Sequence, residues 1–314
     1  MASGIGALAR GLATYVPGVA SLQRRVTHTG GTDSGRYCYS VWMRHLLKSF
    51  ENGLCGEVPS RVAELGPGDS IGVGLAALLS GADYYYGLDA LPLANLKRNL
   101  GVFEELVTLF AAKAEIPGDR EFPGIKPKLA SYQYPAEKLA APDQDRIARI
   151  RASLEEPARS GSMIHYMAPW WSPTVIERGA VDMIFSQAVL EHVEDLDTAY
   201  SAMHAWLAPG GWLSHQIDFR CHGTARQWNG HWAYGDTFWR VLRGRRAFLI
   251  NREPHSTHLR LLKREGFEII CDETATGQGI GRQRLAVRYR SLSDADLQTS
   301  GAFIQARPSA VYHP

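Results

Sequence analysis

The chain has 314 residues, of which 45% are hydrophobic and 21% are charged, a balance typical of a globular protein with a substantial core. Its formal net charge of +2 provides no general attraction for a phosphate backbone, so no nucleic-acid partner is expected. The sequence shows no apolar run long enough to span a bilayer and no CxxC pair among its four cysteines, which favours a cytoplasmic protein with reduced thiols.

The amino-terminal residues 1–60 predict a cap or lid segment. The first twenty residues are interpreted as a frayed terminus, and residues 21–40 as an ordered loop rich in Gly, Thr, Ser and Arg. A helix is expected from about 41 to 51, where Trp42, Leu46 and Phe50 fall roughly on one face.

Strands and helices alternate from residue 61 onward, interrupted by two irregular insertions. The first insertion, about 104–161, is polar and proline-rich, with a short helical stretch near 146–154, and the second, about 220–255, is rich in Trp, His and Arg. Helices are expected at 71–79, 196–207 and 256–265, and strands at 61–65, 84–88, 163–167, 181–185, 212–219, 267–271 and 302–306. This order predicts a doubly wound α/β domain over 61–314 with one mostly parallel sheet of about seven strands.

A glycine turn and a later acid form the first chemical motif. Gly66-Pro67-Gly68 follows the first predicted strand, and Asp89 follows the second strand, 21 residues after Gly68. In such a βαβ unit the turn approaches a ligand, and the acid can bind two ribose hydroxyls. At this stage NAD and S-adenosylmethionine (SAM) fit the motif equally well.

The segment after the fourth predicted strand separates the two cofactors. It reads Ser186-Gln187-Ala-Val-Leu-Glu191-His192, and the helix that follows ends at Pro-Gly-Gly, residues 209–211. With Glu64-Leu-Gly-Pro-Gly before it, this order resembles class I SAM-dependent methyltransferases over roughly a third of the chain. Ser70 stands where that family commonly has a third glycine.

The resemblance implies a SAM site at the carboxyl edge of the sheet. The turn residues would border the methionine part of SAM, the acid of the second strand would hold the ribose, and the residues leaving strand four would face the methyl group. An acid often found after strand three is replaced by Met167-Ala-Pro-Trp170, so backbone groups or Trp170 are expected at the adenine. Tyr37 is expected either as a lid over the cofactor or as a packed core residue. The implied cofactor residues are Tyr37, Glu64, Gly66, Pro67, Gly68, Asp89, Ala90, Ser186 and Gln187.

Methyl transfer to a hydroxyl benefits from a base that removes the proton. His192 is the first candidate because it follows strand four, although it could instead support the turn. Asp218 and His215 on strand five have odd spacing and are expected on opposite faces, with Asp218 nearer the ligand-binding edge. A hydrogen-bonded core position is an equal alternative for His215, and no metal is expected.

The second insertion supplies the candidate acceptor wall. Flat aromatic rings with His and Arg donors suit a sugar face, with core packing as the alternative for each Trp. The candidate residues are Trp228, His231, Trp232, Arg252 and His255. The sequence thus predicts SAM-dependent methylation of a small or carbohydrate-like acceptor at a hydroxyl oxygen, such as a polysaccharide precursor. A NAD-dependent oxidoreductase and a non-catalytic SAM-fold scaffold are the alternatives, and the oligomeric state is left open.

Overall fold

A single seven-stranded sheet forms the centre of the structure, a computed structural model that describes residues 2–16, 31–170, 172–246 and 248–309. The strand order is β3-β2-β1-β4-β5-β7-β6; the first five are parallel neighbours, and β7 runs antiparallel to β5 and β6. The doubly wound, mostly parallel fold predicted from the sequence is confirmed. The strands are β1 (Arg61–Leu65), β2 (Tyr84–Leu88), β3 (Ile164–Met167), β4 (Val181–Gln187), β5 (Leu207–Asp218), β6 (Phe267–Thr276) and β7 (Thr299–Pro308).

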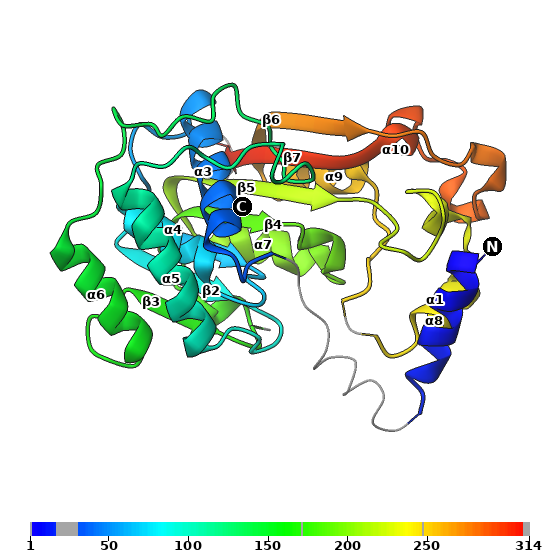
Figure 1. Cartoon of the computed structure of the whole chain (residues 1–314). Helices are drawn as coiled ribbons and strands as arrows, with labels where there is room; N and C mark the ends of the chain where they lie inside the picture. The colour runs from blue at the N-terminus through cyan, green and yellow to red at the C-terminus, as the bar shows by residue number, and fades with distance from the viewer. Residues whose placement is uncertain (1, 17–30, 171, 247, 310–314) are drawn as a thin grey trace.

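Helices cover both faces of the sheet, so central strands such as β1 and β4 are buried on both sides (Figure 1). Alternate residues of β4 enter different cores: Met183 and Phe185 face the first, and Ile184 faces the second. The first core packs against α3 (Gly35–Glu51), α4 (Gly72–Ser80), α5 (Leu96–Ala111) and α6 (Gln144–Glu155), and the second against α7 (Leu196–Trp206) and α9 (His255–Arg264).

Several elements differ from the sequence prediction. Helix α3 begins at Gly35, because the Ser34 side chain caps it by accepting a hydrogen bond from the Tyr37 amide. Helix α5 runs through residue 104, where the first insertion was predicted to start, so irregular chain begins only after Ala111. Its buried Val102, Phe103, Leu106 and Phe110 have helical spacing, a signal that the sequence already carried. Residues 21–30 of the predicted loop lie outside the described residues.

A helix also forms in the amino-terminal segment that was interpreted as frayed. Helix α1 (Ala2–Ala13) packs beside α8 (Asp236–Arg243), a helix within the second insertion that was not predicted (Figure 1). The two axes approach closely because Gly11 has no side chain; a Cβ there would lie 2.1 Å from the Leu242 carbonyl oxygen. The remaining short elements are α10 (Asp294–Gln298) and 3₁₀ turns at Pro173–Val175, Leu190–His192, Gly230–Ala233, Arg282–Arg284 and Val287–Tyr289.

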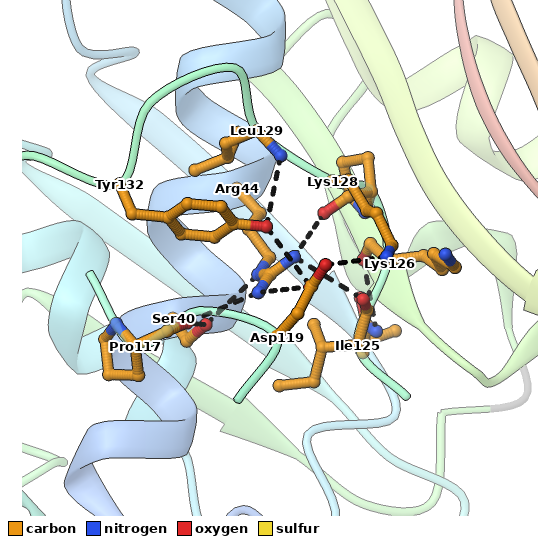
Figure 2. A network of polar contacts seen from close by, with 11 residues as sticks. Ser40, Arg44, Pro117, Asp119, Ile125, Lys126, Lys128, Leu129 and Tyr132 are labelled. Carbon is orange, nitrogen blue, oxygen red and sulfur yellow. Dashed lines mark hydrogen bonds and ion pairs between the residues drawn. The ribbon is translucent and has the colours of Figure 1, made fainter. Parts of the chain in front are cut away.

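The first insertion is held on α3 by a buried arginine (Figure 2). Arg44 Nη1 donates to the Pro127 carbonyl at 2.6 Å and to the Ile125 carbonyl at 3.4 Å, and Nη2 donates to the Pro117 carbonyl at 3.3 Å. Its guanidinium lies 5.0 Å from the centre of the Tyr132 ring. Loop carbonyls that have no strand or helix partner are therefore satisfied by one side chain.

All four cysteines are free. Among the described residues, the structure contains no helix with the length and apolar character needed to cross a membrane. The division into a cap over 1–60 and a domain from 61 onward stays a prediction.

Candidate active site

The glycine turn after β1 lies at the carboxyl edge of the sheet, against the turn that follows β4. Gly66 and Gly68 have φ angles of 65° and 76°, in the left-handed region that favours glycine, with the buried Pro67 between them. A Cβ on Gly66 would lie 2.7 Å from a Val189 methyl carbon. Only glycine lets these two turns meet, so the motif brings backbone amides to this edge without a side chain in the way.

Asp89 is tied to the glycine turn by its carboxylate. One oxygen accepts a hydrogen bond from the Gly68 amide at 2.9 Å, and the other accepts from the Ala90 amide at 2.7 Å. Burial raises the pKa of Asp89, and these backbone hydrogen bonds oppose the rise. A carboxylate fixed beside a glycine turn offers the acceptor oxygens that ribose hydroxyls need, so Asp89 and Ala90 fit the predicted cofactor role.

The acid before the turn is buried beneath it. Tyr85 donates a hydrogen bond of 2.6 Å from its hydroxyl to Glu64. Burial raises the pKa of Glu64 to about 8, partly offset by that hydrogen bond. Tyr37, in the first turn of α3, packs edge-on against Phe122 of the first insertion, with the ring centres 5.6 Å apart. Burial raises the pKa of the Tyr37 hydroxyl to about 12.

The chain before α3 contacts the residues that follow the glycine turn. Ser70, in the position of the missing third glycine, donates its hydroxyl to the Thr32 carbonyl, and its amide donates to the Thr32 hydroxyl at 3.3 Å. Just after β3, the Trp170 amide donates to the Asp89 carbonyl at 3.1 Å, and the Trp170 ring packs edge-on against Trp206. Backbone and indole groups thus stand where an acid was expected.

Ser186 and Gln187, the last two residues of β4, both form side-chain hydrogen bonds. Ser186 Oγ lies 2.8 Å from His215 Nδ1, and Gln187 Oε1 accepts from His45 Nε2 at 3.1 Å. Gln187 also donates to the Lys126 carbonyl of the first insertion at 3.4 Å. Burial lowers the pKa of His45 to about 4 and that of His215 to about 3, so both rings are neutral at neutral pH. His215 is therefore a buried residue that is hydrogen-bonded to Ser186.

Three side chains gather where β4 and β5 end: Glu191, His192 and His222, which we call the edge cluster. Their nitrogen and oxygen atoms lie within 4.8 Å of one another, and the two imidazole rings are 5.0 Å apart. Burial lowers the pKa of His192 to about 4 and raises that of Glu191 well above its ordinary value. This is the one group in the described chain with the composition and spacing to hold a metal ion.

Asp218 borders the edge cluster at the end of β5. Its carboxylate forms hydrogen bonds of 2.5 to 3.0 Å with the Arg220 guanidinium and lies 3.4 Å from His222 Nε2. Burial alone would raise the pKa of Asp218, but the hydrogen bonds from His222 and Arg220 hold it well below its ordinary value. Asp218 and His215 share no hydrogen bond in the described residues, as their odd spacing predicts.

The sequence prediction named His192 and Asp218 but missed Glu191 and His222 as site residues. Glu191 was part of the quoted motif, and His222 stood in the predicted acceptor segment. Their positions in the sequence were the available signal. Glu191 follows β4 and His222 follows β5, and the segments that follow two neighbouring parallel strands lie at the same edge of a sheet.

The predicted acceptor wall is mostly buried. Trp232 is fully buried, donates to the Arg252 carbonyl at 2.9 Å and stacks on Tyr289, and His231 is 1% exposed. Arg252 binds Asp236 at 2.7 Å and lies over the Trp239 ring. These side chains form the core of the second insertion, so an exposed wall made of Trp232, His231 and Arg252 is wrong for this structure.

The other two wall candidates also have internal partners. His255 Nε2 lies 2.8 Å from Asp272, and Trp228 donates to the Gly277 carbonyl at 3.0 Å. His255 is 8% exposed, whereas Trp228 is half-buried. A tryptophan in a loop can bind a ligand or stabilise the loop, and the sequence alone does not separate these uses.

Known proteins give the family. A family profile described as a methyltransferase domain matches residues 39–272, three quarters of the chain. The matched range includes the glycine turn and the edge cluster. A search of curated proteins finds no match. Similar solved structures include a SAM-dependent methyltransferase from Mesorhizobium loti, with 17% identity, 81% of this chain and 94% of that chain covered, and a TM-score of 0.40.

Two further structures are similar at the same level. A SAM-dependent methyltransferase from Methanosarcina mazei has 12% identity, with 83% of this chain and 97% of that chain covered, and a TM-score of 0.43. Phosphoethanolamine N-methyltransferase 2 from Haemonchus contortus, in complex with SAM, has 13% identity, with 85% and 53% covered, and a TM-score of 0.42. The family match, the sheet order and the glycine turn agree, and the chain belongs to the methyltransferase-domain family of SAM-dependent enzymes.

Proposed function

We propose that the protein transfers the methyl group of SAM to a hydroxyl oxygen of a small, hydroxyl-rich acceptor. The observation that carries this proposal is the contact between Gly66 and Val189. Val189 lies two residues before Glu191, so the cofactor turn adjoins the polar group at the ends of β4 and β5. A hydroxyl held by that group would lie beside the cofactor.

The residues around the glycine turn, at the ends of β1, β2 and β3, fit SAM. The Gly66–Gly68 backbone and Glu64 would border its methionine part, Asp89 and Ala90 its ribose, and Trp170 with its neighbouring backbone the adenine. Tyr37 and the segment at Thr32 would cover it. When bound, SAM supplies a methyl group that an aligned nucleophile can displace from sulfur.

Asp218 is the residue best placed to take the acceptor proton. Arg220 and His222 keep its carboxylate ionised, and it lies at the edge where ligands of such sheets bind. An oxygen that gains a methyl group becomes a much stronger acid, so a carboxylate of low pKa suffices for this step. His192, named first from the sequence, is neutral and mostly buried, which makes it a weaker candidate for the base than Asp218.

The carbohydrate-like acceptor rests on the side chains of the second insertion that stay accessible. Trp228 offers part of a ring, and the His222 side chain is 28% exposed. Polysaccharide precursors and nucleotide sugars are therefore the first acceptors to try. The four free cysteines support the cytoplasmic location in which such precursors would be met.

Asp218→Asn tests the catalytic assignment. With labelled SAM and a panel of hydroxyl, amine and carbon acceptors, the variant should lose about 100-fold or more in kcat. Its SAM affinity, measured by calorimetry, should stay within about threefold, because Asp89 holds the cofactor. Asp197→Asn, an exposed carboxylate on α7, is the control and should keep full activity.

Other outcomes separate the alternatives. Label found only on amine or carbon acceptors would remove the hydroxyl proposal. SAM binding without turnover on any acceptor would favour the non-catalytic scaffold. The NAD-dependent alternative is already disfavoured by the family match.

A further inference from the structure

The edge cluster contains buried polar atoms that have no partner. Both carboxylate oxygens of Glu191 and Nδ1 of His192 are buried, and none of the three makes a hydrogen bond of good geometry within the described ranges; the backbone amides of Glu191 and Asp218 are the donors near the carboxylate. Glu191 is 2% exposed. A buried carboxylate without a partner is destabilising, and a buried imidazole nitrogen without one is destabilising to a smaller extent. The arrangement is therefore incomplete without a further group.

The backbone holds these side chains in place. Asn251 donates from its side chain to the Leu190 and Val193 carbonyls, both at 2.8 Å, and from its amide to the Glu191 carbonyl at 2.7 Å. These bonds clamp the 3₁₀ turn that carries Glu191 and His192. The cluster is thus supported by a second layer of hydrogen bonds, as ligand-binding side chains commonly are.

His222 completes the cluster from the other strand. It has a φ of 45°, an uncommon conformation for a residue other than glycine, and its ring lies between His192 and Asp218. Uncommon backbone of this kind costs free energy and persists where the surroundings require it. His222 is also the most exposed member, so the cluster opens to solvent on its side.

We propose that Glu191, His192 and His222 bind one divalent transition-metal cation, with Zn²⁺ as the reference ion. Two imidazoles and one carboxylate are the donor set of catalytic zinc sites, which keep a further position open. Tetrahedral zinc ligands lie about 3.3 Å from one another, given metal–ligand lengths of about 2.0–2.1 Å. The present spacing of up to 4.8 Å is longer, so the three side chains would draw together around the ion.

The cation would act on the acceptor, and this role rests on the proposed function. An acceptor hydroxyl in the open position would be polarised by the cation, which makes its proton easier to remove. The Asp218 carboxylate would take that proton as an oxygen lone pair forms the new bond to the methyl carbon and the bond from that carbon to sulfur breaks. Glu191, His192 and His222 hold the ion throughout and exchange no proton.

Metal binding is tested on the untagged full chain, stripped with chelator and titrated with Co²⁺, followed by calorimetry and visible absorption. The wild type should bind one Co²⁺ per chain. Glu191→Gln and His222→Gln should each weaken binding by roughly 100-fold or more, because one of three ligands is lost. His165→Gln, an exposed histidine on β3, is the matched control and should bind Co²⁺ like the wild type.

The two proposals fail in different ways. A wild type that binds no Co²⁺, or binds it equally in all variants, overturns the metal site, while SAM affinity and label transfer would still test the proposed function. In that case Glu191 is protonated, and Glu191→Gln should be as stable as the wild type.

His222→Gln keeps the test decisive if Glu191→Gln does not fold, because His222 lies at the exposed side. One Co²⁺ bound by a chain that transfers no methyl group would leave the site standing without its proposed role.

Discussion

Each of the two insertions folds around a buried arginine, but the two arginines have different surroundings. Arg44 binds three loop carbonyls of the first insertion, and residues 112–143 contain no regular helix or strand. Arg252 binds one carbonyl and the exposed Asp236, and lies over the rings of Trp239 and Tyr289. The first arginine satisfies backbone groups, whereas the second fills an aromatic core.

The difference follows from what each insertion can bury. The second insertion packs Trp232 into an apolar cluster with Ile280, Leu285 and Tyr289, which belong to the segment between β6 and β7. The first insertion contributes scattered apolar residues to the sheet core and leaves its carbonyls to Arg44. We therefore expect the first insertion to depend on one side chain and the second to depend on packing.

The insertions also serve different parts of the site. The first supplies Phe122 to Tyr37 and the Lys126 carbonyl to Gln187, on the cofactor side. The second begins with His222, on the acceptor side. Weakening either insertion should therefore change a different kinetic constant.

Arg44→Met should have the largest effect. The buried Ile125 and Pro127 carbonyls lose their donor, whereas the Pro117 carbonyl keeps the Ser40 hydroxyl, and we expect the free energy of unfolding to fall by about 3–5 kcal/mol in a urea titration. SAM affinity should fall as the first insertion loosens. Arg36→Met is the matched control, because Arg36 lies on the same helix and binds Glu121 of the same insertion, but is 47% exposed. It should cost less than about 1 kcal/mol, and an equal loss in both variants would contradict the distinction.

Arg252→Met should cost less, about 2 kcal/mol. Methionine can fill the space between Trp239 and Tyr289, and the exposed Asp236 keeps water and Arg288 as partners. The KM for the acceptor should rise while SAM affinity stays near that of the wild type. A loss as large as that of Arg44→Met would show that the second insertion is not held by packing.

Much of the frame could be predicted because its signals are local. The strand, glycine turn and acid from Glu64 to Asp89 lie within 26 residues, and their backbone contacts follow from that order. Helix α5 was missed although its apolar spacing was present, because the prolines that follow it suggested an irregular segment from residue 104 onward. The frame was therefore readable from periodicity, with errors at the element boundaries.

The acceptor side could not be predicted in the same way. Whether Trp232 faces a ligand or a core depends on Ile280, Leu285 and Tyr289, which lie about fifty residues further along the chain. The edge cluster likewise joins Glu191 to His222 across two strands. Composition indicated that this segment was unusual, but the direction of each side chain came only with the fold.

Lowering the pH should destabilise the second insertion before the first. The expected loss of stability is the smallest of the three predicted in this comparison. Burial, with the nearby charge of Arg252, lowers the pKa of His231 to about 3, whereas residues 112–143 contain no histidine. Between about pH 6.5 and 3 the unfolded chain binds a proton at this position that the folded chain excludes, so stability falls as the pH falls. At about pH 5.5 the loss should be about 1 kcal/mol. Hydrogen exchange followed by peptide should rise in the second insertion before the first, and His231→Asn should flatten that response. Equal exchange in both insertions would mean that other buried histidines, such as His45 and His215, unfold the sheet as a unit.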